Sequence, residues 1–376
     1  MPDRPDPYIY IYIYIYSRAM PDHRAMPDHL DPYIIYIYIY IYISSGNARP
    51  SSIRSVKSSI IKLRGDWAWH KAALGMMGWG GEGPTRRCCF KCLANFDTLN
   101  FRDFFETALW KATLLTHDQF IASVVESGCY VSAIFDLPGF RHGMITADLM
   151  HCGDLGVLLY LLGIIMWELI VEMNGVYSNC KQQIHGILSL LRTAANQLHL
   201  KKQPLNNLTI GMIKGKGTSS PKLKVKASDA RHILRCMKFA LEKLVPMETE
   251  HAKQRFLVVK HFCDMYEHLQ HSVGMTSMQA AATSMRKALL LWNELRHADI
   301  DPDNPHNWQT RGFFLWKLYP KHHLLQHLLE DQMLITGNPV GHWCYADESE
   351  IGAAVSLAQT LQYHYLQTSL IDKHRL

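Results

Sequence analysis

Residues 155–167 read LGVLLYLLGIIMW, and the apolar run continues through Glu168 into LIVEM. The first part holds thirteen uncharged residues, whereas a membrane-spanning helix needs about twenty, and a run of about 10 to 14 is more often a buried helix. Glu168 and Glu172 would also have to lie at or near membrane depth. We therefore expect a buried core helix here rather than a transmembrane one, and no membrane among the partners.

The sequence on both sides of this run predicts the rest of the architecture. Short strands are expected at 59–66, 129–135 and 143–148, and a Thr-x-x-Gln capping box at Thr116 opens a helix between the first two. Apolar residues at helical spacing predict further helices at 154–173, 181–199, 228–245, 251–271, 276–298, 321–335 and 349–370. The fold class expected is α+β, predominantly helical, with a small mixed part at each end of a large helical block.

Composition narrows the class of protein. With 48% hydrophobic and 19% charged residues, the 376-residue chain is globular, not collagen-like, mucin-like or an acidic tail. Lys and Arg exceed Asp and Glu by 39 to 33, a mild basic excess that is compatible with a nucleic-acid partner. Nine cysteines without a secretory signal argue against a secreted disulfide framework. We expect reduced thiols and a nuclear or cytoplasmic location.

The N-terminal part is repetitive. Residues 8–16 and 33–43 alternate almost purely between Tyr and Ile, and two RAMPDH units lie between them. Uncharged alternation of this kind is typical of aggregation-prone strands rather than of a domain. We expect a disordered or low-complexity N-terminus without a function of its own. A Ser/Arg-rich linker follows at 44–59, and the folded part begins near Ser59.

Acidic residues stand where strands and a late helix would bring them together. Asp66 and Asp148 end two of the expected strands, His151 follows Asp148 by one helical turn, and Glu348 lies near the C-terminal end. Such carboxylates suit two-metal phosphoryl transfer, in which two ions about 3.5–4 Å apart activate the attacking oxygen and stabilise the leaving oxygen. Hard oxygen ligands favour Mg²⁺. Taken singly, each acid is more often a helix cap or a solvated charge.

Cysteine and histidine spacing suggests a second kind of site. Cys89-Phe-Lys-Cys92 has the spacing of one half of a tetrahedral Zn²⁺ site, and a pair of inert thiols or a redox pair is the alternative. His323 and His327 share one face of an expected helix, where a surface or packing role is favoured over metal binding. No second C-x-x-C exists, so the remaining zinc ligands would be scattered; the candidates are His142, His151 and Cys152.

One loop is strongly basic. Residues 214–226, KGKGTSSPKLKVK, contain five lysines and no acid. No aromatic residue interleaves them, so the loop suits contacts with nucleic-acid phosphates rather than base stacking, and a solvated loop is the plain alternative. The candidate nucleic-acid contacts are Lys214, Lys216, Lys222, Lys224 and Lys226.

Taken together and in this order, these segments resemble the DDE/D transposases, especially the CACTA-type group and its relatives. IIKLRGDWAWHKAALGMMGW, followed by CCFKC, is similar to the segment that carries the family's second catalytic Asp, here Asp66. ADLMHCGDLGVLLYLLG is similar to the family's Asp-x-Met-His segment, here Asp148 and His151. YPKHHLLQHLLED and GNPVGHWCYADE resemble the closing run that ends in the catalytic Glu, here Glu348, with Glu350 as the fallback.

The resemblance covers about residues 59–360 and implies an RNase H-like α/β core that a large all-α insertion interrupts. The implied division is a repeat and linker at 1–50, the N-terminal part of the core with the C-x-x-C at 51–151, a helical insertion at 152–320, and C-terminal helices that complete the core at 321–376.

The implied function is DNA strand transfer with Mg²⁺ or Mn²⁺ on Asp66 and Glu348, while Asp148 and His151 order the strand end; DNA and a second copy of the chain are the implied partners. The family's first catalytic Asp should precede Asp66, where this chain has the Tyr/Ile repeat. We therefore expect an N-terminally truncated and inactive relic. The alternative is a non-catalytic module on the same fold that binds zinc and nucleic acid through the C-x-x-C pair and the lysine loop.

Overall fold

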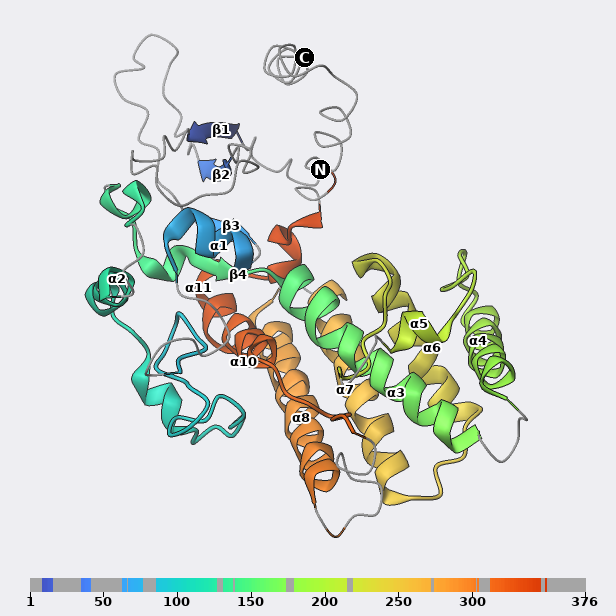
Figure 1. Cartoon of the computed structure of the whole chain (residues 1–376). Helices are drawn as coiled ribbons and strands as arrows, with labels where there is room; N and C mark the ends of the chain where they lie inside the picture. The colour runs from blue at the N-terminus through green and yellow to red at the C-terminus, as the bar shows by residue number, and fades with distance from the viewer. Residues whose placement is uncertain are drawn as a thin grey trace, which may run out of the picture. The chain divides into compact units, whose positions relative to one another are not determined.

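In the computed structural model the described residues are 9–15, 35–41, 63–65, 67–76, 86–126, 131–137, 139–173, 179–214, 219–271, 274–301, 303, 312–345 and 349. The chain divides into two compact units, residues 1–147 and residues 148–376. The described structure is predominantly helical, as the sequence predicts (Figure 1).

Two strand pairs lie in the first unit. The Tyr/Ile tracts form β1 (Ile9–Ile15) and β2 (Ile35–Ile41), which pair antiparallel. β3 (Leu63–Gly65) and β4 (Ile145–Ala147) pair parallel, with Leu63 opposite Ile145 and Gly65 opposite Ala147. Both short strands lie where the sequence predicts them. In the described residues β3 and β4 pair only with each other, so the larger sheet of an RNase H-like core stays an expectation.

Short helices fill the rest of the first unit: α1 (Trp67–Leu74), η1 (Leu109–Thr113), α2 (His117–Glu126), η2 (Ala133–Asp136) and η3 (His142–Met144). The predicted capping box opens α2. The Thr116 backbone N donates to Gln119 Oε1 at 2.9 Å, and the Gln119 backbone N donates to Thr116 Oγ1 at 3.3 Å. Two backbone donors that have no partner within the helix are thereby satisfied.

The strand predicted at 129–135 is wrong in its described part. Residues 133–136 form the 3₁₀ helix η2 instead. Its start is fixed by Ser132, whose hydroxyl accepts from the Ile134 backbone N at 3.4 Å and whose carbonyl accepts from the Phe135 backbone N at 3.0 Å. A serine side chain that bonds to nearby backbone groups favours a turn over a strand, and this local preference outweighs the apolar run.

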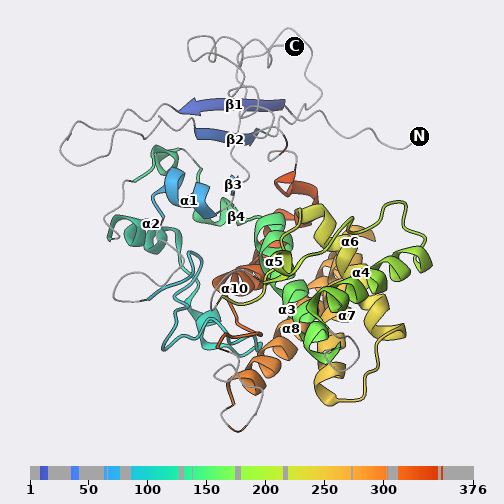
Figure 2. The same ribbon diagram turned by 45° about the vertical axis from the view of Figure 1, so that its right-hand side comes forward.

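Helices make up the described part of the second unit. Their order is η4 (Met150–Leu158), α3 (Leu159–Glu172), α4 (Cys180–Gln197), α5 (Ile210–Ile213), α6 (Ala227–Lys243), α7 (Glu250–His271), α8 (Met275–Ile300), α10 (Pro320–His327), η6 (Leu328–Gln332), α11 (Met333–Thr336) and η7 (Pro339–His342). α7 packs along α8, and α4 packs against α6 (Figure 2). The helix predicted at 349–370 lies outside the described residues apart from Ser349.

η4 and α3 form one continuous apolar helix, Met150–Glu172, whose first part is wound as a π-helix. It is the one helix in the described ranges that is long and apolar enough to cross a membrane, with a mean hydropathy of 2.0, and 78% of it is buried inside the protein. Glu168 is buried with it and accepts hydrogen bonds from Trp316 Nε1 at 2.8 Å and from Arg255 at 3.2 Å. A helix with this much of its surface inside the protein and a buried, hydrogen-bonded acid has the properties of a core helix, as the sequence predicts.

The lysine loop is held against this core helix by its backbone. The Leu223 backbone N donates to the Leu159 carbonyl at 2.9 Å. A Cβ atom at Gly163 would lie 2.7 Å from the Lys222 backbone N, closer than real Cβ contacts come. Only glycine therefore lets the segment at 222–223 cross α3 at this distance.

Candidate functional site

The second unit begins with a buried acid–histidine pair. Asp148 follows β4 directly, and its Oδ2 lies 2.7 Å from His151 Nδ1 and accepts from the His151 backbone N at 2.9 Å. Burial acts to raise the pKa of Asp148, but its hydrogen bonds and charge interaction with His151 outweigh that effect and lower the pKa. The Nδ1 contact orients the ring, so that Nε2 is the nitrogen turned away from the carboxylate.

The other oxygen of Asp148 holds a distant part of the chain. The Cys344 backbone N donates to Asp148 Oδ1 at 2.9 Å, across 196 positions of sequence. Cys344 is buried, and it offers a ligand atom within 4.8 Å of those of Asp148 and His151. Both oxygens of Asp148 are thus engaged by groups of the protein, which makes Asp148 a positioning residue for His151 and for the segment around Cys344.

A second buried acid fixes the same segment. Asp154, in η4, accepts from Tyr345 Oη at 2.6 Å and from Tyr266 Oη, and Arg231 Nε lies 3.4 Å from its Oδ2. The Arg231 guanidinium also lies over the ring of Trp343, 4.4 Å from its centroid. Burial raises the pKa of Asp154 to about 6. Residues 343–345 are therefore tied to η4 and α6 by side chains.

The two proposed metal carboxylates, Asp66 and Glu348, lie outside the described residues. The structure describes their neighbours: Gly65, which precedes Asp66, and Tyr345, three positions before Glu348. The fallback residue Glu350 also lies outside the described ranges.

In the first unit, Cys89 and Cys92 occupy a turn built around their sulfur atoms. The Lys91 backbone N lies 3.3 Å from Cys89 Sγ, and the Ala94 backbone N lies 3.4 Å from Cys92 Sγ; both donate to sulfur. An amide hydrogen directed at sulfur lowers the pKa of a thiol, but burial and the neighbouring Cys89 outweigh this effect and raise the pKa of Cys92. The neighbouring Cys88 differs, because its Sγ donates to the Ala94 carbonyl at 3.5 Å and so acts as a thiol.

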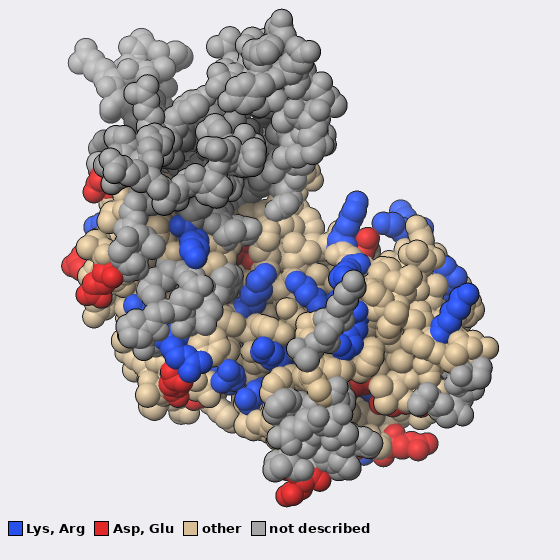
Figure 3. Space-filling view, viewed as in Figure 1, with Lys and Arg blue, Asp and Glu red and all other residues tan. Residues whose placement is uncertain are grey.

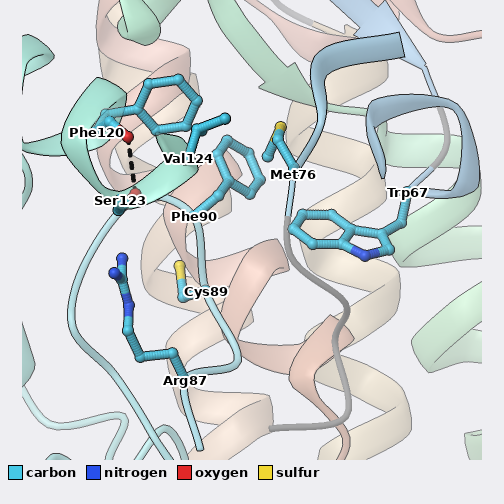
Figure 4. Close-up of a pocket in the computed structure, with 8 residues that line it drawn as sticks. All are labelled: Trp67, Met76, Arg87, Cys89, Phe90, Phe120, Ser123 and Val124. Atoms are coloured by element: carbon cyan, nitrogen blue, oxygen red, sulfur yellow. Dashed lines mark hydrogen bonds between the residues drawn. The ribbon is translucent and has the colours of Figure 1, made fainter. Parts of the chain in front are cut away.

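Cys89 also borders a small cavity of about 20 Å³ in the first unit, shown in Figure 4. Trp67, Phe90 and Phe120 are among its walls. This is room for about one water molecule, so the cavity is not a ligand site.

In the second unit, His323 and His327 face each other one turn apart on α10. Their Nε2 atoms are 3.1 Å apart, both side chains are buried, and His327 Nδ1 lies 2.5 Å from Asp331 Oδ2. A carboxylate on the far ring nitrogen is the arrangement that orients metal-binding histidines. The predicted shared face is confirmed. Both rings are enclosed, so of the two roles that the sequence favours, a surface helix is wrong and packing agrees with the structure.

The chain thus carries buried cysteine and histidine ligands of the kind that hold a metal ion. The other candidate zinc ligands are engaged differently: His151 bonds to Asp148, Cys152 is buried in η4, and His142 stacks on Phe120 with a ring-centroid distance of 5.6 Å. Burial lowers the pKa of His142 to about 4.

The lysine loop does not stand apart from aromatic residues. Lys222 Nζ lies 5.1 Å from the ring centroid of Tyr160, and Lys214 Nζ lies 4.1 Å from that of Phe313. Lys224 and Lys226 are exposed, and Lys216 lies outside the described residues. The aromatic rings that these lysines contact belong to distant parts of the chain, so the sequence of the loop itself does not reveal them.

Sequence reasoning missed the residues that surround Asp154. Tyr266, Arg231 and Tyr345 lie far apart in the chain and have no shared spacing, so no local pattern connects them.

Comparison with protein family models, with curated proteins and with solved structures found no match to the chain.

Proposed function

We propose that this chain is a transposase-like DNA-binding protein whose strand-transfer site takes divalent metal ions at Asp66 and Glu348, ordered by Asp148 and His151. One observation carries the proposal: the parallel register of β3 and β4 sets Gly65 opposite Ala147. Parallel strands end at the same sheet edge, and the residues that follow these two in the sequence are Asp66 and Asp148.

The third segment is held by the bond between Asp148 and the Cys344 backbone, four positions before Glu348. The proposal brings these three segments together at one site. In the proposal, Asp66 and Glu348 would hold Mg²⁺ or Mn²⁺, and the bound ion would supply the Lewis-acid activation of a water or a 3′-hydroxyl that attack on a phosphodiester requires. In the proposal His151, whose ring Asp148 orients, orders the strand end. The Tyr/Ile repeat stands upstream of Asp66, where the resemblance implies the family's first catalytic Asp, so the proposal for these residues is metal binding and DNA binding with little or no cleavage.

The test is iron-directed cleavage of the protein chain itself. Fe²⁺ added in place of Mg²⁺, with ascorbate and peroxide, cuts the polypeptide near the bound ion, and mass spectrometry locates the cuts. We expect cuts near residues 66, 148 and 348, competed by Mg²⁺ and lost together in Asp66→Asn and in Glu348→Gln. Cuts near only one of these positions, or cuts unaffected by both substitutions, would refute the shared site. Plasmid nicking with Mn²⁺ then measures any remaining activity.

A specific observation favours a second function, zinc binding. We propose that Cys89 and Cys92 supply two ligands of a structural Zn²⁺ site. Their C-x-x-C spacing is that of one half of a tetrahedral zinc site, and the backbone amides of Lys91 and Ala94 are directed at the two sulfurs.

Metal analysis of the purified full chain should find about one zinc per chain. Cys92→Ser should lose it, while the matched neighbour Cys88→Ser should keep it. Co²⁺ bound in place of zinc should show thiolate charge-transfer absorption that disappears in Cys92→Ser. Zinc retained in Cys92→Ser, or no zinc in the wild-type chain, would contradict the proposal.

A further inference from the structure

We infer that Tyr160, Tyr319, Lys222 and Lys317 form a binding surface for the phosphate backbone of DNA beside the Asp148–His151 pair; the inference rests on the proposed function and names where the DNA strand would lie. The two tyrosines stack with their ring centroids 4.2 Å apart and an angle of 26° between the rings. A lysine ammonium group lies over each ring: Lys222 Nζ is 5.1 Å from the Tyr160 centroid, and Lys317 Nζ is 5.3 Å from the Tyr319 centroid.

The positions of these side chains are fixed by the backbone beneath them. Lys222 belongs to the segment that crosses α3 at Gly163. Tyr319 caps α10: its backbone N donates to His322 Nδ1 at 3.0 Å, and Pro320 begins the helix. Tyr160 lies in α3 itself. The surface is therefore already ordered without a ligand, which lowers the entropy cost of binding.

Among the described side chains, neither Lys222 nor Lys317 forms an ion pair with a carboxylate. Lys317 is exposed and Lys222 is half-buried. In Figure 3, Lys and Arg side chains gather in the middle of the face, in the area that α3 and α10 occupy in Figure 1, while Asp and Glu lie mostly toward the rim. The positive charge of the two lysine ammonium groups therefore attracts an anion.

A third lysine links this surface to the candidate site. Lys321 Nζ donates to the His151 carbonyl at 3.1 Å, and its side chain lies across Gly156 in η4. A strand that follows the lysines would therefore pass next to His151, where the proposed chemistry takes place.

The arrangement selects phosphates rather than bases. The tyrosine faces are used by each other and by the ammonium groups, so they offer no open face for a base to stack on. Ammonium groups held over aromatic rings are positioned by cation–π attraction and keep donors for phosphate oxygens. The ligand is thus a phosphodiester backbone, recognised without regard to sequence, and its binding should weaken steeply with salt.

The experiment measures binding of the full chain to a fluorescein-labelled DNA duplex by anisotropy, over a range of KCl and in EDTA so that no metal-dependent step contributes. The double variant Lys222→Gln/Lys317→Gln should bind about 10–100-fold more weakly near 0.1 M salt, with a salt slope smaller by about 2, because each lysine neutralises one phosphate. Lys222→Arg/Lys317→Arg should restore binding. The control Lys201→Gln/Lys243→Gln changes the net charge equally at exposed positions of the same unit.

Each of three results would overturn the inference: a Gln variant with the DNA affinity and salt slope of the wild type, an equal weakening of binding in the control variant, or no DNA binding by the wild type. An independent readout separates it from the proposed function. If iron cuts near residues 66, 148 and 348 persist while the Gln variant binds DNA normally, the surface assignment fails alone. If the cuts are absent but the Gln variant loses binding, the surface stands and the metal site fails.

Discussion

The buried carboxylate of Asp154 predicts an unusual pH dependence of stability. Its side chain is fully enclosed, and burial raises its pKa from 3.8 to about 6. The folded protein therefore holds a proton on Asp154 between about pH 4 and pH 6, where the unfolded chain has released it. The contribution of this group to stability is fully present below the unfolded pKa and is lost as the pH rises through the folded pKa.

The size of the effect follows from the shift. About two pKa units correspond to about 3 kcal/mol. Asp154→Asn replaces the group by a neutral amide of the same shape, so its stability should not change with pH through this group. The free energy of unfolding of the second unit, measured in urea from pH 4 to pH 7, should fall in the wild type relative to Asp154→Asn by up to about 3 kcal/mol.

Taking the difference between the two proteins removes the contributions of other titrating groups. Tyr345→Phe provides a second perturbation, since it removes a hydrogen bond that lowers the pKa of Asp154. In Tyr345→Phe the fall in the free energy of unfolding should therefore extend to higher pH than in the wild type. A difference that stays flat from pH 4 to pH 7 would refute the reasoning. A difference that rises with pH would show that the Arg231 charge outweighs burial.

Three further predictions concern stability, each measured by urea unfolding. Gly163→Ala should cost about 1–3 kcal/mol because its Cβ would meet backbone rather than a flexible side chain, whereas Gly143→Ala, with nothing within 4 Å, should cost far less; equal costs would contradict the close approach. Arg255→Met should cost about 3–5 kcal/mol because it leaves Glu168 buried without its guanidinium, and a loss below about 1 kcal/mol would show that Glu168 is held by its other partners. Thr116→Ala should cost about 0.5–2 kcal/mol through the capping box, and an unchanged midpoint would show that the cap does not stabilise the folded unit.

Local signals in the sequence predicted elements whose causes are local. The apolar run at 155–167 lies in a helix that is mostly buried inside the protein, as its short uncharged stretch and the following Glu168 predict. The capping box at Thr116 needs only residues three apart, and both of its hydrogen bonds form. At 129–135 the apolar pattern misled, since a serine hydroxyl favours a turn.

The candidate site was less predictable because its parts are distant in the sequence. The spacing of Asp148 and His151 placed them together, yet nothing local indicates that the Cys344 backbone bonds to Asp148. The spacing of His323 and His327 predicts a shared face, but whether that face is enclosed depends on what packs over it. Likewise, Tyr319 and Lys317 meet Tyr160 and Lys222 only through the packing of α10 near α3.

The attachment of residues 343–345 has a consequence for incomplete versions of this protein. A ribosome that stops before Trp343 would produce a chain in which Asp154 loses one hydroxyl donor and Asp148 loses an amide donor, while the aromatic cover over Arg231 is missing. Solvent would then enter the interior beside the long apolar helix. Such fragments should be degraded quickly, so a nonsense mutation late in the reading frame would remove the whole protein and not only its last segment.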